Sequence, residues 1–326
     1  MSATPVPESS DWFAKPSSWS DMELWHREVG VIRREEPVLE VNRPGYERFW
    51  VLTRHADVFG VSRDNVTWNN TVRSVLGTDA DFERMVESGL PLPKTLVHLD
   101  GTDHRDHRGV TSDWFKPGVV SKRQPRIDAI ADEFIAKMRD MGGRCDFALD
   151  IAQPYTLRVI MEIYGVPAED EPLMLELTQG IFGAADPEFM GDADSQEARV
   201  IESVMRFIAY FNDVTEARRG CPTDDLASLI ANGEVNGCPM DDEHRLWYYI
   251  IVATAGHDTT SFALAGGLEA LVRNPDQLKA LGENPDLVNQ AADEVIRWTS
   301  PVRHFLRYAQ VDTAVGGVSI PAGGRV

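Results

Sequence analysis

At residues 253–261 the chain reads Ala253-Thr254-Ala255-Gly256-His257-Asp258-Thr259-Thr260-Ser261, within its longest apolar stretch, residues 246–272. The surrounding pattern predicts one long helix over residues 241–273 that ends at Asn274-Pro275. Glycine in a helix interior costs about 0.5–1 kcal/mol relative to alanine, and Asp and Thr side chains compete for backbone hydrogen bonds. Poor helix formers in the most apolar helix indicate a functional site. The alternative is a kinked core helix whose polar groups are satisfied.

Helical patterns also occupy most of the chain on both sides of this stretch. Residues 21–29 and 57–63 predict short helices, and residues 196–219 predict a long amphipathic one. Residues 285–299 predict a further helix that Ser300-Pro301 ends. Residues 73–99, in contrast, predict loops.

The two ends of the chain contain extended segments. Residues 37–41 and 49–53 flank a turn at Pro44-Gly45, which predicts a β-hairpin. Residues 303–326 are extended around a turn at Gly316-Gly317, and we expect the two ends to meet in one sheet. The predicted fold class is therefore mainly α with a small β-sheet. Its β-rich parts are residues 37–53 and 303–326, and its helical body is residues 55–299.

One charged pair follows the central stretch. Glu294 and Arg297, at i and i+3, share a helix face and can form an ion pair. The apolar residues beside them, such as Trp298, predict partial burial. The alternative is a solvated surface pair, which contributes about 0–1 kcal/mol.

Another charged pair precedes the stretch. His104 and Arg108, at i and i+4, place two donors on one helix face, which suits an anionic ligand such as a carboxylate. The alternative is a basic helix end that interacts favourably with the helix dipole.

In this order the features resemble the cytochrome P-450 family. HxxxR at residues 104–108 precedes AGxDTT at 255–260, ExxR at 294–297, and Arg307 before the Gly-Gly turn. The resemblance covers nearly the whole chain and is strongest to soluble bacterial members, nearest the terpineol-oxidising branch. The further segments that carry it are residues 49–58, 114–117, 165–167, 170–179, 253–261, 297–299 and 319–323.

The resemblance implies a single cytochrome P-450 domain over residues 1–326 that binds haem b. His104, Arg108 and Arg307 match positions that hold the haem propionates, because buried carboxylates need paired donors. Ala255 and Gly256 match positions that leave room for dioxygen beside the cofactor.

The resemblance also assigns catalytic and structural roles. Asp258 and Thr259 match the pair that relays protons through water to dioxygen, which is general acid chemistry. Glu294 and Arg297 match a structural pair that supports the fold on the proximal side of the haem. His257 fills a variable position, so we assign it no catalytic role and expect a neutral imidazole that packs or hydrogen-bonds away from the site.

The implied reaction inserts one oxygen atom into an unactivated C–H bond of a small, monoterpenoid-like hydrophobic substrate. Dioxygen and electrons from a ferredoxin-type donor are consumed. A basic segment could attract an acidic ferredoxin to this acidic chain, although local charge variation is the alternative. Its basic residues are Arg105, Arg108, Lys116, Lys122, Arg123 and Arg126.

Composition narrows the partners further. The 326 residues carry a net charge of −20, which disfavours nucleic acids and anionic membrane surfaces. The polar first 20 residues do not resemble a signal peptide or a membrane anchor. Three cysteines without a CxxC pattern indicate a reducing compartment and no structural zinc site. We therefore expect a cytoplasmic monomer.

The cysteine that holds the iron in this family has no counterpart here. Cys145, Cys221 and Cys238 all precede the ExxR pattern, and none lies in the Phe-Gly-x-Gly-x-x-x-Cys-x-Gly loop. We expect the fold to be incomplete at its C-terminus, with the axial cysteine beyond Val326. On that expectation, residues 1–326 alone bind haem weakly or not at all and are inactive.

Three alternatives remain. The chain could be a catalytically dead fragment without the thiolate, or a sterol or fatty-acid hydroxylase of the same family. It could also be an all-α terpene cyclase that binds magnesium diphosphate, because Asp224-Asp225 and Asp241-Asp242 are acidic pairs. Neither pair continues as DDxxD, because Ser228 and Arg245 occupy the position of the last acid.

Overall fold

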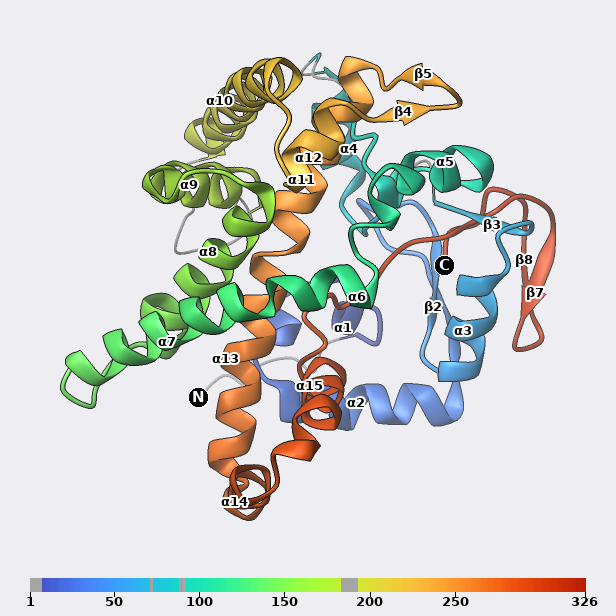
Figure 1. Cartoon of the computed structure of the whole chain (residues 1–326). Coiled ribbons are helices and arrows are strands. Elements are labelled where there is room, and N and C mark those ends of the chain that lie inside the picture. Colours follow the sequence, from blue (N-terminus) through green and yellow to red (C-terminus); the bar gives the residue numbers. More distant parts are fainter. Residues whose placement is uncertain (1–7, 71–72, 88, 90–91, 183–192) are drawn as a thin grey trace. The chain divides into compact units, whose positions relative to one another are not determined.

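A computed structural model describes residues 8–70, 73–87, 89, 92–182 and 193–326 of the chain (Figure 1). The fold divides into two compact units. Unit 1 contains the N-terminal part through Arg105 together with His304–Val326, and unit 2 contains Asp106–Arg303. No helix in the described ranges combines the length and apolarity that crossing a bilayer requires.

The hairpin predicted near the N-terminus is confirmed. Strands β1 (Val38–Val41) and β2 (Phe49–Leu52) pair antiparallel, with Val38 opposite Leu52. Gly45 adopts φ +83°, a value that glycine tolerates without a Cβ clash, and the Tyr46 N–H donates to Arg43 O at 3.1 Å. The Pro-Gly turn therefore forms as the sequence indicates.

The two ends of the chain meet in unit 1 as predicted, but the predicted single sheet is divided into two-stranded ladders. Strand β3 (Trp68–Asn69) pairs antiparallel with β6 (Tyr308–Ala309), and Arg325 bridges Phe49 on one side and Tyr308 on the other. Strands β7 (Thr313–Val315) and β8 (Val318–Ile320) form the hairpin expected at Gly316-Gly317.

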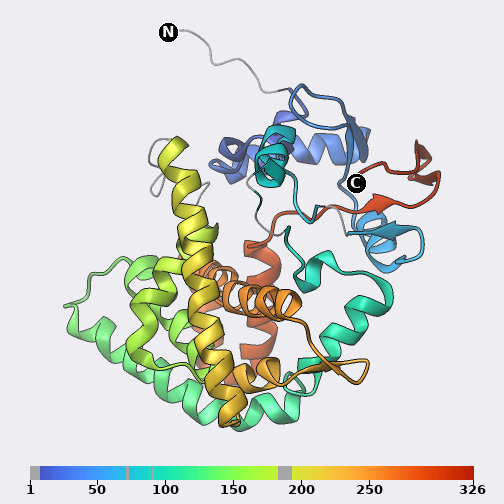
Figure 2. The same ribbon diagram turned by 90° about the horizontal axis from the view of Figure 1, so that it is seen from above.

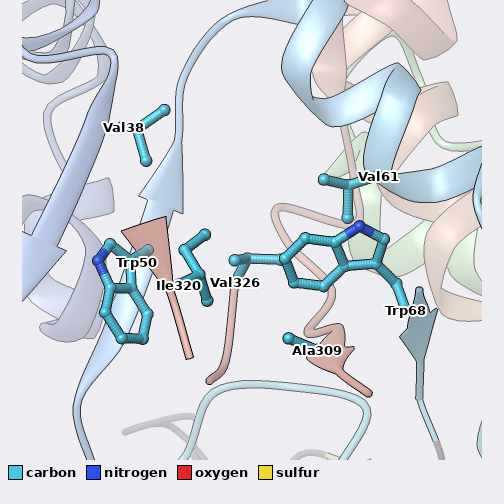
Figure 3. Packing of buried hydrophobic residues seen from close by; sticks show 7 residues of the cluster. All are labelled: Val38, Trp50, Val61, Trp68, Ala309, Ile320 and Val326. Carbon is cyan, nitrogen blue, oxygen red and sulfur yellow. The ribbon is translucent and has the colours of Figure 1, made fainter. Parts of the chain in front are cut away.

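The core of unit 1 lies between these strands and helix α3 (His55–Arg63). Its two largest side chains are Trp50 from β2 and Trp68 from β3, both nearly inaccessible (Figure 3). Burial of such large side chains is the main source of stability for a small sheet. The other labelled members of the cluster are Val38, Val61, Ala309, Ile320 and Val326.

One helix of unit 1 was missed in a segment predicted to form loops. Helix α4 (Asp79–Glu87) begins with a reciprocal cap, in which the Thr78 N–H donates to Asp81 at 3.2 Å and the Asp81 N–H donates to Thr78 Oγ1 at 3.1 Å. This Thr-x-x-Asp pattern is an acidic variant of the capping box, so the signal was present in the sequence. The other helices of the unit are α1 (Asp11–Ala14), η1 (Pro16–Trp19), α2 (Met22–Glu35) and η2 (Leu96–His98).

Helix α5 (Gly101–Ser112) runs from unit 1 into unit 2, which is otherwise built of helices and one short hairpin. In Figure 2 the long helix α10 (Ala193–Gly220), drawn in yellow, lies along its neighbours α9 and α11. The remaining early elements of unit 2 are α6 (Pro117–Val120), η3 (Ser121–Arg123), α7 (Gln124–Asp140), η4 (Phe147–Ala152), α8 (Gln153–Tyr164), η5 (Ala168–Asp170), α9 (Glu171–Phe182), α11 (Leu226–Ala231), β4 (Glu234–Val235) and β5 (Cys238–Pro239).

The end of unit 2 contains the helices that carry the central stretch and the ExxR pair. They are α12 (Asp242–Ala255), α13 (Asp258–Arg273), α14 (Pro275–Glu283), η7 (Pro285–Leu287) and α15 (Val288–Thr299). Helix α13 contacts α8, η4, α14 and α15, so it is the central helix of this unit (Figure 1).

Candidate functional site at the junction of two helices

The predicted single helix over residues 241–273 is wrong, because the structure interrupts it at the central stretch. Helix α12 ends at Ala255 and α13 begins at Asp258, with Gly256 and His257 in a turn between them. The His257 N–H donates to Thr254 O at 3.3 Å, and the Thr259 hydroxyl donates to Ala255 O at 2.8 Å. A side-chain hydroxyl bonded to the carbonyl four residues before it is a common cause of helix bends. The alternative of a kinked helix therefore describes the backbone correctly.

Gly256 has a packing role at this junction. A Cβ on Gly256 would lie 2.6 Å from Ile160 Cδ1 of α8, closer than carbon atoms can approach. The glycine thus lets α8 pack directly against the junction. Neighbouring Ala255, in contrast, is exposed. The two residues therefore differ in role: Gly256 packs against α8, and Ala255 faces outward.

His257 and Asp258 form the most closely spaced polar pair of the junction. The His257 side chain is completely buried, and its Nδ1 lies 3.2 Å from Asp258 Oδ1. On the other side of the ring, Nε2 lies 3.2 Å from Gln153 O of α8. Burial lowers the pKa of His257, which Asp258 and Gln153 only partly offset. Burial likewise raises the pKa of Asp258. The neutral imidazole stays a prediction, which the lowered pKa supports, but its expected position away from the site is wrong, because Nδ1 faces Asp258.

Thr259 stands at the edge of an open apolar surface. Ala255 and Thr260 are exposed, and Phe262, one turn further along α13, is 60% exposed. An exposed phenylalanine on the central helix of a unit is unusual, because such a helix normally buries its apolar residues. Ala255 and Phe262 thus leave apolar side chains accessible on the same stretch of helix as the Thr259 hydroxyl.

Helix α15 carries the predicted Glu294–Arg297 pair. Arg297 donates two parallel hydrogen bonds to Glu294, at 2.6 and 2.7 Å, so the pairing is confirmed. Its predicted partial burial is wrong here, because both side chains are exposed and Trp298 beside them is 64% exposed. Apolar neighbours in the sequence did not indicate burial, because only one side of α15 packs against α13.

Two glycines of α13 allow that close packing. A Cβ on Gly266 would lie 2.8 Å from Thr299 Cγ2, and one on Gly267 would lie 2.6 Å from Val295 Cγ1. The backbone of α13 therefore positions the helix that carries the ExxR pair, which is consistent with a structural role for that pair.

The three predicted propionate ligands do not lie in one unit. His104 and Arg108 are one turn apart on α5, but His104 belongs to unit 1 and Arg108 to unit 2. Arg307, in unit 1, donates to Leu306 O at 2.8 Å. Arg108 is exposed, and among the residues that the structure describes no acidic side chain pairs with it. An unpaired guanidinium in a chain of net charge −20 is consistent with an external anionic ligand.

Comparison with known proteins assigns the chain to a family. The profile of the family described as Cytochrome P450 (written here cytochrome P-450) matches residues 62–326, so the chain belongs to it. A Pseudomonas protein named cytochrome P-450-terp is 37% identical over 95% of this chain and 75% of its own length. The crystal structure of CYP108D1 from Novosphingobium aromaticivorans superimposes with a TM-score of 0.89 at 37% identity, covering 98% of this chain and 77% of that one.

More distant relatives differ in the substrate that their names state. Linalool 8-monooxygenase of Pseudomonas putida is 27% identical over 90% of this chain and 72% of its own length. Steroid C26-monooxygenase of Mycolicibacterium smegmatis is 28% identical over 92% of this chain and 69% of its own length. The chain is therefore a member of a bacterial monooxygenase family with the cytochrome P-450 fold, and the predictions of family and fold class are confirmed.

The family implies a haem cofactor, and the described residues fit part of it. The open apolar surface beside Thr259 suits the macrocycle, and the unpaired Arg108 suits a propionate. The cysteines do not fit an axial ligand, because Cys145, Cys221 and Cys238 are all exposed, in unit 2, and none lies on α12, α13 or α15. His257 is the polar residue of the site that the sequence prediction left without a role. Its position beside Asp258 in the most apolar stretch was the available signal.

Proposed function

We propose that the protein hydroxylates a compact hydrophobic substrate of the monoterpenoid class, using dioxygen and electrons from a ferredoxin-type donor. The observation that carries the proposal is the α12–α13 junction. There the carboxyl of Asp258 and the hydroxyl of Thr259 lie at neighbouring positions beside an open apolar surface. Family membership supports the reaction class, and the junction supports the assignment of Asp258 and Thr259 to proton delivery.

In this proposal, separate residues would bind the haem and deliver protons. Arg108, His104 and Arg307 would hold the propionates of haem b, and the surface of Ala255 and Thr259 would face the dioxygen site. When bound, a thiolate-ligated haem would supply the chemistry that activates dioxygen and the C–H bond. Asp258 would exchange protons with water, and Thr259 would position that water. Gly256 would act indirectly, through its contact with Ile160.

None of the three cysteines in this sequence fits as the haem ligand, because all three are exposed and none lies on α12, α13 or α15. We expect a polypeptide of residues 1–326 mixed with haem to give no thiolate-type carbon-monoxide difference spectrum, because its cysteines are exposed and distant in sequence from α15. A normal thiolate spectrum that disappears in a Cys145→Ser, Cys221→Ser or Cys238→Ser variant would contradict this expectation and identify the ligand.

The substrate class can be tested by binding. In a preparation whose haem carries a thiolate ligand, we expect α-terpineol and linalool to shift the haem spectrum at lower concentrations than a sterol or a fatty acid. The expectation rests on relatives whose names refer to such compounds, and the steroid C26-monooxygenase match is the reason to include the sterol. Tighter binding of the sterol would favour the alternative of a sterol hydroxylase.

The proposed ferredoxin contact depends on which basic residues are free to act. Within unit 2, Lys116 pairs with Asp113 at 2.6 Å and Arg126 with Glu162 at 3.2 Å. Arg123 lies over the Trp114 ring at 3.9 Å and donates to Asp224 O at 3.1 Å, so it stabilises the fold. Lys122 is the better test position, because it is exposed and, in the described part of the chain, joins no ion pair.

Charge reversal at this position separates docking from local charge variation. Lys122→Glu should slow electron transfer from an acidic ferredoxin several-fold at low salt and little at high salt, because salt screens steering. Lys279→Glu on α14, where the native lysine lies 3.7 Å from Glu283, is the control. Equal salt dependence in both variants would contradict docking at Lys122.

We further propose a cytoplasmic monomer, which the three exposed free cysteines support.

A further inference from the structure

His257 is the ionisable side chain of the junction that is most completely buried, yet the proposed function gives it no task. Its side chain has no exposed surface, and both ring nitrogens face oxygen atoms. Gln153 O, 3.2 Å from Nε2, is a carbonyl oxygen and can only accept a hydrogen bond. Nε2 must therefore carry a hydrogen. In a neutral imidazole this leaves Nδ1 as a bare acceptor.

The second contact of the ring then needs a proton. Nδ1 and Asp258 Oδ1 are 3.2 Å apart, and two acceptors at this distance, one of them fully buried, repel one another. One proton between them removes the repulsion. It can sit on the ring, giving imidazolium and carboxylate, or on the carboxyl, giving a neutral imidazole and a carboxylic acid.

The burial of the two groups distinguishes these forms. The contact is imperfectly aligned whichever group donates, because the Nδ1 lone pair and an Nδ1–H point in the same direction, so alignment within the described residues does not choose the donor. The His257 side chain has no exposed surface, so an imidazolium there would be fully desolvated. A proton kept on Asp258, whose side chain is 24% exposed, leaves both groups neutral. Burial therefore favours the carboxyl as the donor.

We propose that His257 is a positioning residue that keeps Asp258 in its acid form, with the Asp258 O–H donated to Nδ1 and the His257 Nε2–H donated to Gln153 O. The inference rests on the proposed role of Asp258 in proton delivery and adds the group that retains the proton.

Other charged groups around the pair are already matched within the described residues. On α8, Arg158 pairs with Glu171 and Glu133, and Glu162 pairs with Arg126. On η4, the Asp150 carboxylate accepts from the Asp146 N–H at 2.8 Å, and on α15 Arg297 pairs with Glu294. The pKa values of His257 and Asp258 depend on burial, on each other and on Gln153 O.

The proton can leave only through Asp258. His257 has no exposed surface, whereas the Asp258 side chain is 24% exposed. When the acid acts, its O–H bond breaks, the proton passes to a water molecule, and the carboxylate remains. The carboxylate then takes one proton from solvent and restores the acid. His257 stays neutral throughout and keeps its hydrogen on Nε2.

Selective isotope labelling of the 326-residue chain tests this inference without any turnover measurement. At about pH 7, ¹⁵N-histidine NMR should show His257 as the neutral tautomer protonated at Nε2. ¹³C-carboxyl labelling of aspartate should show one protonated carboxyl that disappears in Asp258→Asn. Asp241→Asn, which alters the exposed histidine–aspartate pair of α12, should leave that signal unchanged.

Two substitutions of the histidine separate its contacts. His257→Gln can keep a donor toward Gln153 O but has no acceptor at the Nδ1 position, so Asp258 should lose its proton at the same pH. His257→Asn keeps an acceptor near Asp258 and should preserve the acid. If His257→Gln does not fold, the comparison of the ¹³C-carboxyl spectra of wild type and Asp258→Asn is sufficient to show whether Asp258 is protonated.

Several outcomes would overturn the inference. They are an imidazolium at His257, a hydrogen on Nδ1, or an aspartate spectrum in which every carboxyl is ionised. A protonated Asp258 together with unchanged turnover of Asp258→Asn in haem-loaded enzyme has a different meaning. That result would refute the catalytic role in the proposed function and leave the shared proton standing.

Discussion

Helix α12 has a histidine–aspartate pair at each end, and the two pairs differ in burial: the first is largely exposed and the second is largely buried. At the N-terminal end, Asp241 accepts from the His244 N–H at 2.9 Å and lies 2.7 Å from His244 Nδ1 through its other oxygen. The Asp241 side chain is 61% exposed. At the C-terminal end, His257 is completely buried against α8, and the Asp258 side chain is only 24% exposed.

The different surroundings shift the carboxyl pKa values of the two pairs in opposite directions. Partial burial pushes the pKa of Asp241 up, but the hydrogen bonds from His244 outweigh it and leave that pKa below its usual value. Burial dominates at Asp258 and raises the pKa, with only partial compensation by His257. The exposed Asp241 carboxylate caps helix α12, whereas the mostly buried Asp258 carboxyl is the one that we propose retains a proton.

The largest expected difference between the two ends is in turnover. In enzyme with a thiolate-ligated haem, Asp258→Asn should lower turnover by about 100-fold, because a general acid contributes that much or more to a proton-limited step. Asp241→Asn should change it less than about twofold, because Asp241 acts only on the helix end. Equal losses in the two variants would mean that both act through stability, which a thermal unfolding measurement would reveal.

The second expected difference concerns packing at the buried end. Gly256→Ala should destabilise the protein by about 1–3 kcal/mol, because the added Cβ would lie 2.6 Å from Ile160 Cδ1. Gly282→Ala on α14 is the matched control. No atom lies within 4 Å of its Cβ position, so the change should be neutral or stabilising by up to about 1 kcal/mol. Urea unfolding measures both, and an unaffected Gly256→Ala would show that α8 can move away at little cost.

Much of the fold followed from the sequence, because its signals are local. The Pro44-Gly45 turn and the alternating segments beside it predicted the β1–β2 hairpin. The break after Ala255 was anticipated only as the alternative of a kinked helix, because apolar periodicity continues through it and the Thr259 hydroxyl bond and the α8 contact are visible only in the structure. The exposure of Trp298 was missed for a similar reason, since burial depends on which helix packs against α15.

The site, like the fold, combines features with a local sequence signal and contacts between segments that are distant in sequence. An ordered set of motifs led to the proposed roles of Asp258 and Thr259, which stay predictions, whereas the ExxR spacing correctly predicted its ion pair. The contact of His257 with Gln153 O spans 104 positions of sequence, so no local pattern contained it. Whether His104, Arg108 and Arg307 hold a common ligand remains a prediction from the family pattern.

A smaller effect is expected at the exposed end of α12. Asp241→Ala removes the acceptor for the His244 N–H and should cost about 1 kcal/mol, the usual contribution of an N-cap. Asp241→Asn retains an acceptor and should recover most of that loss. A cost above about 3 kcal/mol would indicate a buried role for Asp241, contrary to its exposure, and denaturant unfolding at neutral pH distinguishes these outcomes.

The pH dependence of stability gives the smallest and most specific test of the comparison. The pKa of His257 is lowered by burial, so the unfolded chain takes up a proton near the ordinary value of 6.5 while the folded chain does not. Stability from this residue is therefore present above pH 6.5 and is lost as the pH falls below it. The pKa of Asp241 is also lowered, but for a carboxyl this contribution is present above 3.8 and is lost only below that value.

These two windows do not overlap, which makes the test decisive. The stability difference between wild type and His257→Gln should shrink as the pH falls from about 7.5 to about 5. The difference between wild type and Asp241→Ala should stay constant over that range and shrink only in stronger acid. Asp258 acts with the opposite sign, since its raised pKa lets the folded chain take up a proton before the unfolded chain does. Repeating the titration in the Asp258→Asn background removes that contribution. In that background, the stability difference between the protein that retains His257 and its His257→Gln variant should depend on pH between about 7.5 and 5. A pH-independent effect of His257→Gln would mean that burial does not hold His257 neutral, and the contrast between the two ends of α12 would fail.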